Sequence, residues 1–104
     1  MCGIFGYIGK QNVKETLIKG LKLLEYRGYD SAGIATINNE IEITKSTGNI
    51  SNLEKILDYS NTSNIGIAHT RWATHGKPSV ENAHPHISNN NEWAIVHNGV
   101  KYLV

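Results

Sequence analysis

The 104-residue chain is poor in several features that would assign it to a common class. Its single cysteine excludes an internal disulfide and a paired-cysteine redox or zinc motif. Ten basic residues against nine acidic ones leave a net charge of +1, and no basic stripe of the kind that binds nucleic acid is present. No apolar run approaches the roughly 20 residues that span a membrane. We therefore expect neither nucleic acid nor a membrane as a partner.

Signals for export and for metal binding are also missing from the sequence. No basic segment followed by an apolar one opens the chain, which predicts a cytoplasmic protein. His84 and His86 flank a proline, but the five histidines lack the neighbouring cysteines and the spacing of a structural zinc site. We therefore expect no metal and no cofactor.

Hydrophobic spacing predicts an α+β fold with a mainly antiparallel sheet. The expected elements are a strand at 2–8, a helix at 13–26, strands at 32–37 and 41–47, a short helix near 53–57, and strands at 65–70 and 92–98. Asn12 with Glu15, and Ser51 with Glu54, are the predicted helix caps. Gly20 in the first helix predicts a tight packing contact. The loop at 71–91 is long enough to suggest a functional segment.

Cys2 is the most informative residue, because it directly follows the initiator methionine. A small second residue favours methionine removal, so we expect Cys2 to be the mature N-terminus. Its α-amine, with a pKa of about 7.7–8.0, can then act as base for a thiol of pKa about 8.5. N-terminal nucleophiles are activated in this way. The alternative is an ordinary small hydrophobic cysteine in a first strand.

Three further polar segments lie where predicted strands begin or end, namely 25–33, 68–76 and 97–99. Rigid scaffolds usually carry binding and catalytic groups on such connections. Each segment also has a simpler explanation. These are a surface ion pair of Arg27 with Asp30, a cation–π contact of Arg71 with Trp72, and a type I′ turn at Asn98–Gly99.

Considered together, the segments supply the groups that a thiol needs to attack a carboxamide. The side-chain amide of Asn98 and the N–H of Gly99 can donate to a tetrahedral oxyanion, and one such donor contributes about 2.7–4 kcal/mol where it has been measured. Arg71 can bind a carboxylate with a bidentate fork. Cys2 would be the nucleophile.

Five segments resemble the glutaminase domain of the isomerising glutamine–fructose-6-phosphate aminotransferases, which are class II glutamine amidotransferases of the N-terminal-nucleophile hydrolase type. They are Cys2–Gly6, Leu24–Gly33, Gly66–Gly76, Asn82–His86 and His97–Gly99. The opening Cys-Gly-Ile fits every class II amidotransferase. The second and third segments are much narrower and favour this family over its purine, asparagine and glutamate synthase relatives.

The resemblance implies a role for each catalytic group. Cys2 would attack the glutamine carboxamide to form a glutamyl thioester, with its own amine as general base. Asn98 and Gly99 would form the oxyanion hole.

The resemblance also implies a set of binding residues. Arg71 would hold the α-carboxylate of glutamine, and Thr74 and His75 would line the substrate pocket. Trp72 would lie between the glutaminase site and an ammonia channel. Arg27 would help to order the site near the nucleophile.

In the family the chain continues beyond Gly99 into further elements, among them an aspartate that binds the glutamine α-amino group. The resemblance therefore implies that residues 1–104 are the N-terminal part of a type-2 amidotransferase domain, with a partial sandwich of two sheets between helices. We expect glutamine as substrate, weak glutaminase activity, and self-association through exposed sheet edges. Fructose 6-phosphate would be reached only through sugar-isomerase domains that these residues lack. The alternatives are a non-catalytic remnant of this family or another class II amidotransferase.

Overall fold

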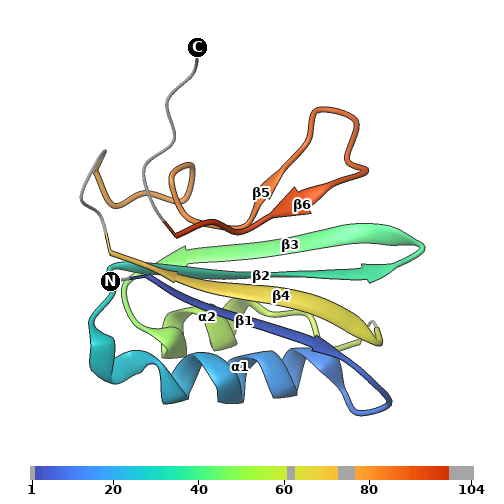
Figure 1. The fold of residues 1–104 in the computed structure, drawn as a ribbon, viewed down its shortest axis with the longest axis horizontal. Helices are drawn as coiled ribbons and strands as arrows, with labels where there is room; N and C mark the ends of the chain where they lie inside the picture. The colour runs from blue at the N-terminus through green and yellow to red at the C-terminus, as the bar shows by residue number, and fades with distance from the viewer. Residues whose placement is uncertain (1, 61–62, 73–76, 99–104) are drawn as a thin grey trace.

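A computed structural model describes residues 2–60, 63–72 and 77–98, and Figure 1 shows their arrangement. The elements are β1 (Gly3–Ile8), α1 (Val13–Leu23), the 3₁₀ turn η1 (Glu25–Arg27), β2 (Ser31–Asn38), β3 (Glu40–Thr47), α2 (Ile50–Ile56), β4 (Ile65–Arg71), β5 (His86–Ile87) and β6 (Ala94–Ile95). The first four strands form an antiparallel sheet in the order β1-β4-β2-β3. Both helices cover one face, and the β5–β6 ladder lies on the other side (Figure 1). The predicted α+β class and antiparallel pairing are confirmed.

Helix α1 forms where its apolar stripe predicts it. The Asn12 side chain accepts the N–H of Lys14 at 3.1 Å and caps the first turn. Leu17 and Leu21 are fully buried against the sheet. A Cβ at Gly20 would lie 2.6 Å from the ring of Phe5, so the predicted tight contact at this glycine is confirmed.

Both predicted helix boundaries need correction. Helix α1 ends at Leu23, and the chain then tightens into η1, which Gly28 ends with a positive φ of 80°. Helix α2 begins at Ile50, and its cap is Asn49, whose side chain accepts the N–H of Asn52. The predicted Ser51 cap is therefore wrong, because an asparagine two residues earlier already satisfies the first turn.

The β2–β3 hairpin is confirmed, with Asn38 opposite Glu40 and Asn39 in the left-handed region at φ 69°. The strand predicted at 92–98 is much shorter than expected. Only Ala94 and Ile95 form a strand there. Their partner strand, β5, lies inside the stretch 71–91 that was predicted as a loop.

Local turn chemistry explains the short β5–β6 ladder. The hydroxyl of Ser88 accepts the N–H groups of Glu92 and Trp93 and closes a tight turn between the two strands. Trp93 and Ile95 face solvent, with 73% and 52% of their surface exposed. These two side chains therefore add nothing to the buried core.

The sheet face opposite the helices remains partly open. Register and strand alternation place four isoleucines on it, each at least 40% exposed: Ile4, Ile8, Ile37 and Ile65. Strands β1 and β3 are the edges of the sheet. Of the helices in the described ranges, none has the length and apolar character needed to cross a bilayer.

On the covered face, Lys14 is almost fully buried, with 1% of its surface exposed. Its ammonium donates to the carboxylate of Glu42 on β3 and to the main-chain carbonyl of Asp58, which follows α2. A buried ion pair costs desolvation, and removing one partner leaves the other charge uncompensated. Lys14 thus connects α1, β3 and the end of α2.

Replacing Lys14 with methionine should lower the free energy of unfolding by about 1–3 kcal/mol, because Glu42 and the Asp58 carbonyl then lose the ammonium that donates to them. The double variant Lys14→Met/Glu42→Leu should regain most of that loss. Urea denaturation followed by circular dichroism measures both. Lys22→Met, which breaks the exposed pair with Glu54, is the control and should change stability far less. Equal losses for Lys14→Met and Lys22→Met would contradict a special role for the buried pair.

Candidate active site

The predicted nucleophile and the predicted carboxylate anchor lie at the same end of the main sheet. Gly3 pairs with Thr70, so Cys2 and Arg71, the residues next to them, are adjacent at the ends of β1 and β4. The N–H of Gly3 also donates to the Thr70 hydroxyl at 3.1 Å, which fixes the register. The Cys2 side chain is partly exposed, as a reacting thiol requires.

The segment between η1 and β2 connects the strand ends around this site. The N–H of Asp30 donates to the carbonyl of Arg71 at 2.8 Å, and its own carbonyl accepts the N–H of Gly48 at 2.9 Å. The main chain of Asp30 thereby bonds to the end of β4 and to the residue after β3. The ring of half-exposed Trp72 lies over Gly28, where a Cβ would be 3.5 Å from it.

Tyr29, within the same segment, supports the fold. Its hydroxyl accepts the N–H of Ile50 at 2.7 Å, at the start of α2. Burial raises the pKa of Tyr29, while this hydrogen bond opposes the shift. The segment that carries Arg27 and Asp30 is therefore anchored to the second helix.

Arg71 is oriented by the chain that follows the site. Its Nη1 donates to the carbonyl of Lys77 at 3.3 Å, and the side-chain amide of Asn82 donates to the same oxygen at 2.9 Å. The guanidinium is thus held at the end of β4 by a segment that Asn82 also fixes. This arrangement suits a planar donor group that must meet a carboxylate in one orientation.

Residues 83–86 pack closely against the sheet face that the helices leave open. A Cβ at Gly33 would lie 2.2 Å from the carbonyl oxygen of His84, so this approach requires a glycine. Lys45 on β3 donates to the carbonyl of Ala83 at 2.9 Å. Burial lowers the pKa of Lys45, and the charge of Glu81 opposes that shift. Residues 83–86, which we call the loop layer, are therefore bound to β2 and β3.

Three histidine rings lie together where residues 83–86 meet the sheet: His84 stacks on His69, and the ring of His86 is tilted against that of His84. The ring centroids of His69 and His84 are 4.1 Å apart and nearly parallel, and those of His84 and His86 are 4.3 Å apart. The Nε2 of His69 lies 2.9 Å from the carbonyl oxygen of His97. Burial lowers the pKa of His69, and it lowers that of His84 to about 3, with neighbouring positive groups adding to the effect. His69 and His84 are therefore neutral near pH 7.

Four of the predicted site residues come together at one end of the molecule. Cys2, Arg71 and Trp72 lie at the strand ends, and the carbonyl before Asn98 is bonded to β4 two residues from Arg71. In Figure 1 the short described segment after β6 runs toward the end of the sheet at which β1 begins.

The other predicted residues are only partly visible. Thr74, His75 and Gly99 lie outside the described residues. The main chain of Arg27 is in η1, next to Gly28.

His69 and His84 are not among the site residues predicted from the sequence. The sequence of β4 already indicated a buried position for His69. Strand alternation places this residue on one face with Ile65, Ile67 and Arg71. A histidine in line with isoleucines indicates a buried ring, and a buried ring needs a specific partner.

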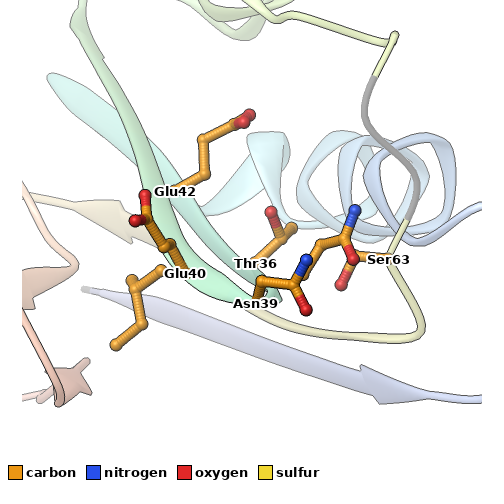
Figure 2. Close-up of a pocket in the computed structure, with 7 residues that line it drawn as sticks. Thr36, Asn39, Glu40, Glu42 and Ser63 are labelled. Carbon is orange, nitrogen blue, oxygen red and sulfur yellow. The ribbon is translucent and has the colours of Figure 1, made fainter.

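A pocket elsewhere contains none of the predicted residues. Figure 2 shows it at the β2–β3 turn, at the opposite end of the sheet. Glu40, Glu42, Asn39 and Ser63 are among the residues that line it. The carboxylate of Glu42 forms a salt bridge with Lys14. Within the described ranges, no group of three or more histidine, cysteine or acidic side chains could hold a metal ion.

Comparison with known proteins finds relatives that share more than half of the aligned residues. The chain is 59% identical over 101 residues to glutamine–fructose-6-phosphate aminotransferase [isomerizing] of Oceanobacillus iheyensis, and 53% identical over 104 residues to that of Chlorobaculum tepidum. In sequence, the chain is similar to a part of these aminotransferases. Each match takes in 96% of the chain but only 17% of the relative's length. No protein-family model matches the chain.

Solved structures show the same fold in more distant proteins. An allosteric regulatory enzyme of purine biosynthesis superposes with a TM-score of 0.72 at 28% identity, over 88% of this chain and 20% of that one. A glutamine phosphoribosylpyrophosphate amidotransferase from B. subtilis gives 0.68 over the same shares. The chain thus has an amidotransferase fold, and its sequence is nearer to the sugar-phosphate aminotransferases than to these purine enzymes.

The depressed pKa of His84 predicts an acid-sensitive fold. An unfolded histidine titrates near pH 6.5, whereas folded His84 stays neutral down to about pH 3. The unfolded chain therefore binds more protons in that interval, and the free energy of unfolding should fall as the pH drops from 6.5 toward 3.

Urea denaturation between pH 7.5 and 5 should show this decline, and His84→Phe should make it shallower, because phenylalanine keeps a ring in the stack but takes up no proton. Parallel profiles for the wild type and His84→Phe would mean that His84 titrates alike in the folded and unfolded chain.

Proposed function

We propose that this chain is the glutamine-hydrolysing part of an amidotransferase, with Cys2 as its nucleophile. One observation carries the proposal. Cys2 and Arg71 lie at the same end of the sheet, and the carbonyl of His97, the residue before Asn98, is bonded to β4 near that end. These residues come from three segments distant in sequence. Each contributes a different chemical function that hydrolysis of a carboxamide requires.

In the proposed reaction the α-amine of Cys2 takes the thiol proton, and the sulfur attacks the carboxamide carbon of glutamine. The Asn98 amide and the Gly99 N–H stabilise the oxyanion of the tetrahedral intermediate. The carbon–nitrogen bond then breaks, ammonia leaves with the proton, and a glutamyl thioester remains on the sulfur. Water cleaves the thioester to give glutamate and restores the thiol.

Binding of glutamine is assigned to the residues beside the nucleophile. Arg71 would form a bidentate pair with the α-carboxylate, since its guanidinium is oriented at the end of β4. Thr74 and His75 would line the pocket, and Arg27 would help to order the loop below it. Trp72, whose ring is half-exposed, would cover the side on which ammonia departs.

The relatives' name gives fructose 6-phosphate as the substrate that accepts the amino group. For this chain the sugar phosphate would be bound by residues other than these 104, which correspond to 17% of each relative's length. Residues 1–104 would then be the N-terminal part of a type-2 amidotransferase domain, acting in the cytoplasm. The exposed isoleucines and the edge strands β1 and β3 favour self-association.

A non-catalytic remnant is the competing function, and a covalent probe distinguishes the two even where turnover is slow. The L-form of a glutamine analogue with a diazoketone in place of the carboxamide should alkylate Cys2 in a saturable manner, and intact mass spectrometry should show one adduct on a chain lacking Met1. Glutamine should protect against labelling, and Cys2→Ser should abolish it. Equal labelling by the D-form, or retention of Met1 in most molecules, would favour the remnant.

Replacing Arg71 with lysine should raise the analogue concentration for half-maximal labelling at least tenfold, because a point charge cannot reproduce a planar fork. The rate at saturation should change little. Iodoacetamide, which has no carboxylate to be bound, is the matched control and should label Cys2 equally fast in both proteins. An unchanged half-maximal concentration would remove Arg71 from the site.

A further inference from the structure

Asn98 is exposed and lies on a segment with little secondary structure of its own. The strand before it, β6, is only two residues long and pairs only with the equally short β5. A ladder of this size is not stable by itself. An amide that must donate to an oxyanion therefore needs an additional attachment to the sheet.

His69 supplies such an attachment from the centre of the sheet. It is fully buried on β4, opposite Ile4 on one neighbouring strand and Gly33 on the other. Its Nε2 lies 2.9 Å from the carbonyl oxygen of His97, the residue before Asn98. A carbonyl oxygen only accepts, so Nε2 carries the hydrogen.

The surroundings of His69 determine which of its two ring nitrogens carries the proton and donates this hydrogen bond. The second ring nitrogen, Nδ1, is buried without a partner, so protonating it would place an unsatisfied donor in the interior. The neutral tautomer with the proton on Nε2 is therefore selected. Stacking on His84 at 4.1 Å and 19° keeps the ring from rotating out of this geometry.

We propose that His69 is a positioning residue for glutamine hydrolysis, because its Nε2–H holds the carbonyl of His97 and thereby fixes Asn98 relative to Cys2. The inference rests on the proposed function of Asn98. Strand β4 carries His69 and also pairs with β1, which follows Cys2. One strand therefore sets the distance between the nucleophile and its oxyanion donor. A displacement of about 1 Å at a reacting centre can cost on the order of a hundredfold in rate.

The competing explanation is that His69 only fills space beneath the loop layer. Two ring substitutions separate the explanations. His69→Phe keeps an aromatic ring on His84 but removes the donor, whereas His84→Phe alters the neighbouring ring of the same stack and leaves the His69–His97 bond in place. His69→Gln loses the stack but restores a donating N–H.

Steady-state hydrolysis of glutamine by the 104-residue chain tests the catalytic consequence. His69→Phe should lower kcat by about 10–100-fold with KM within threefold, since Arg71 still binds the substrate. His84→Phe should leave both constants within threefold, and His69→Gln should recover at least part of the lost kcat. Equal losses in both phenylalanine variants would show that only packing matters and would overturn the proposal.

Nuclear magnetic resonance tests the attachment without any turnover. The Nε2–H of His69 should exchange slowly with solvent in the wild type. The main-chain amide signal of Asn98 should broaden or split in His69→Phe and stay single in His84→Phe. An Asn98 signal unchanged in His69→Phe would refute the proposal even if Cys2 labels normally. Failure of Cys2 labelling with an intact His69–His97 bond would instead refute the proposed function.

Discussion

The close approach of residues 83–86 to Gly33 is the constraint on which the candidate site depends. No side chain fits at Gly33, because a Cβ would lie 2.2 Å from the carbonyl oxygen of His84. This contact allows the loop layer to settle on β2, and Lys45 then bonds it to β3. Only in that position does His84 stack on His69. The chain then continues from this layer through β5 and β6 to Asn98.

The two faces of the sheet have different tasks. The helix-covered face contains the apolar core and the buried Lys14–Glu42 pair, and it provides most of the burial that stabilises the chain. The other face carries the histidines and the loop layer, and at its end the strand register places Cys2 beside Arg71. This face can hold exposed and oriented groups because the opposite face supports the fold.

Burial keeps His69 and His84 neutral near pH 7. Three imidazoles within ring-contact distance repel one another when charged, and desolvation disfavours each cation further. A neutral ring donates from one nitrogen only. The hydrogen bond to the His97 carbonyl decides which nitrogen carries the proton, so the local electrostatics and the geometry of the site select the same tautomer.

Local signals in the sequence predicted much of the fold. Asn12 and the leucines after it predicted α1, and the alternation around Asn39 predicted the β2–β3 hairpin, since caps, periodicity and turn residues act over a few positions. The same reasoning failed at Ser51 and at 92–98. There a neighbouring asparagine and a tight turn at Ser88 decided the outcome.

The sequence by itself determined the chemical groups of the candidate site, because Cys2, Arg71 and Asn98 each follow from a motif or a position in the chain. Only the tertiary structure decided how they are held. His69 reaches His97 across 28 positions of sequence, and Gly33 meets His84 across a still longer separation. Such contacts arise from strand order and layer packing, which a short window of residues does not encode.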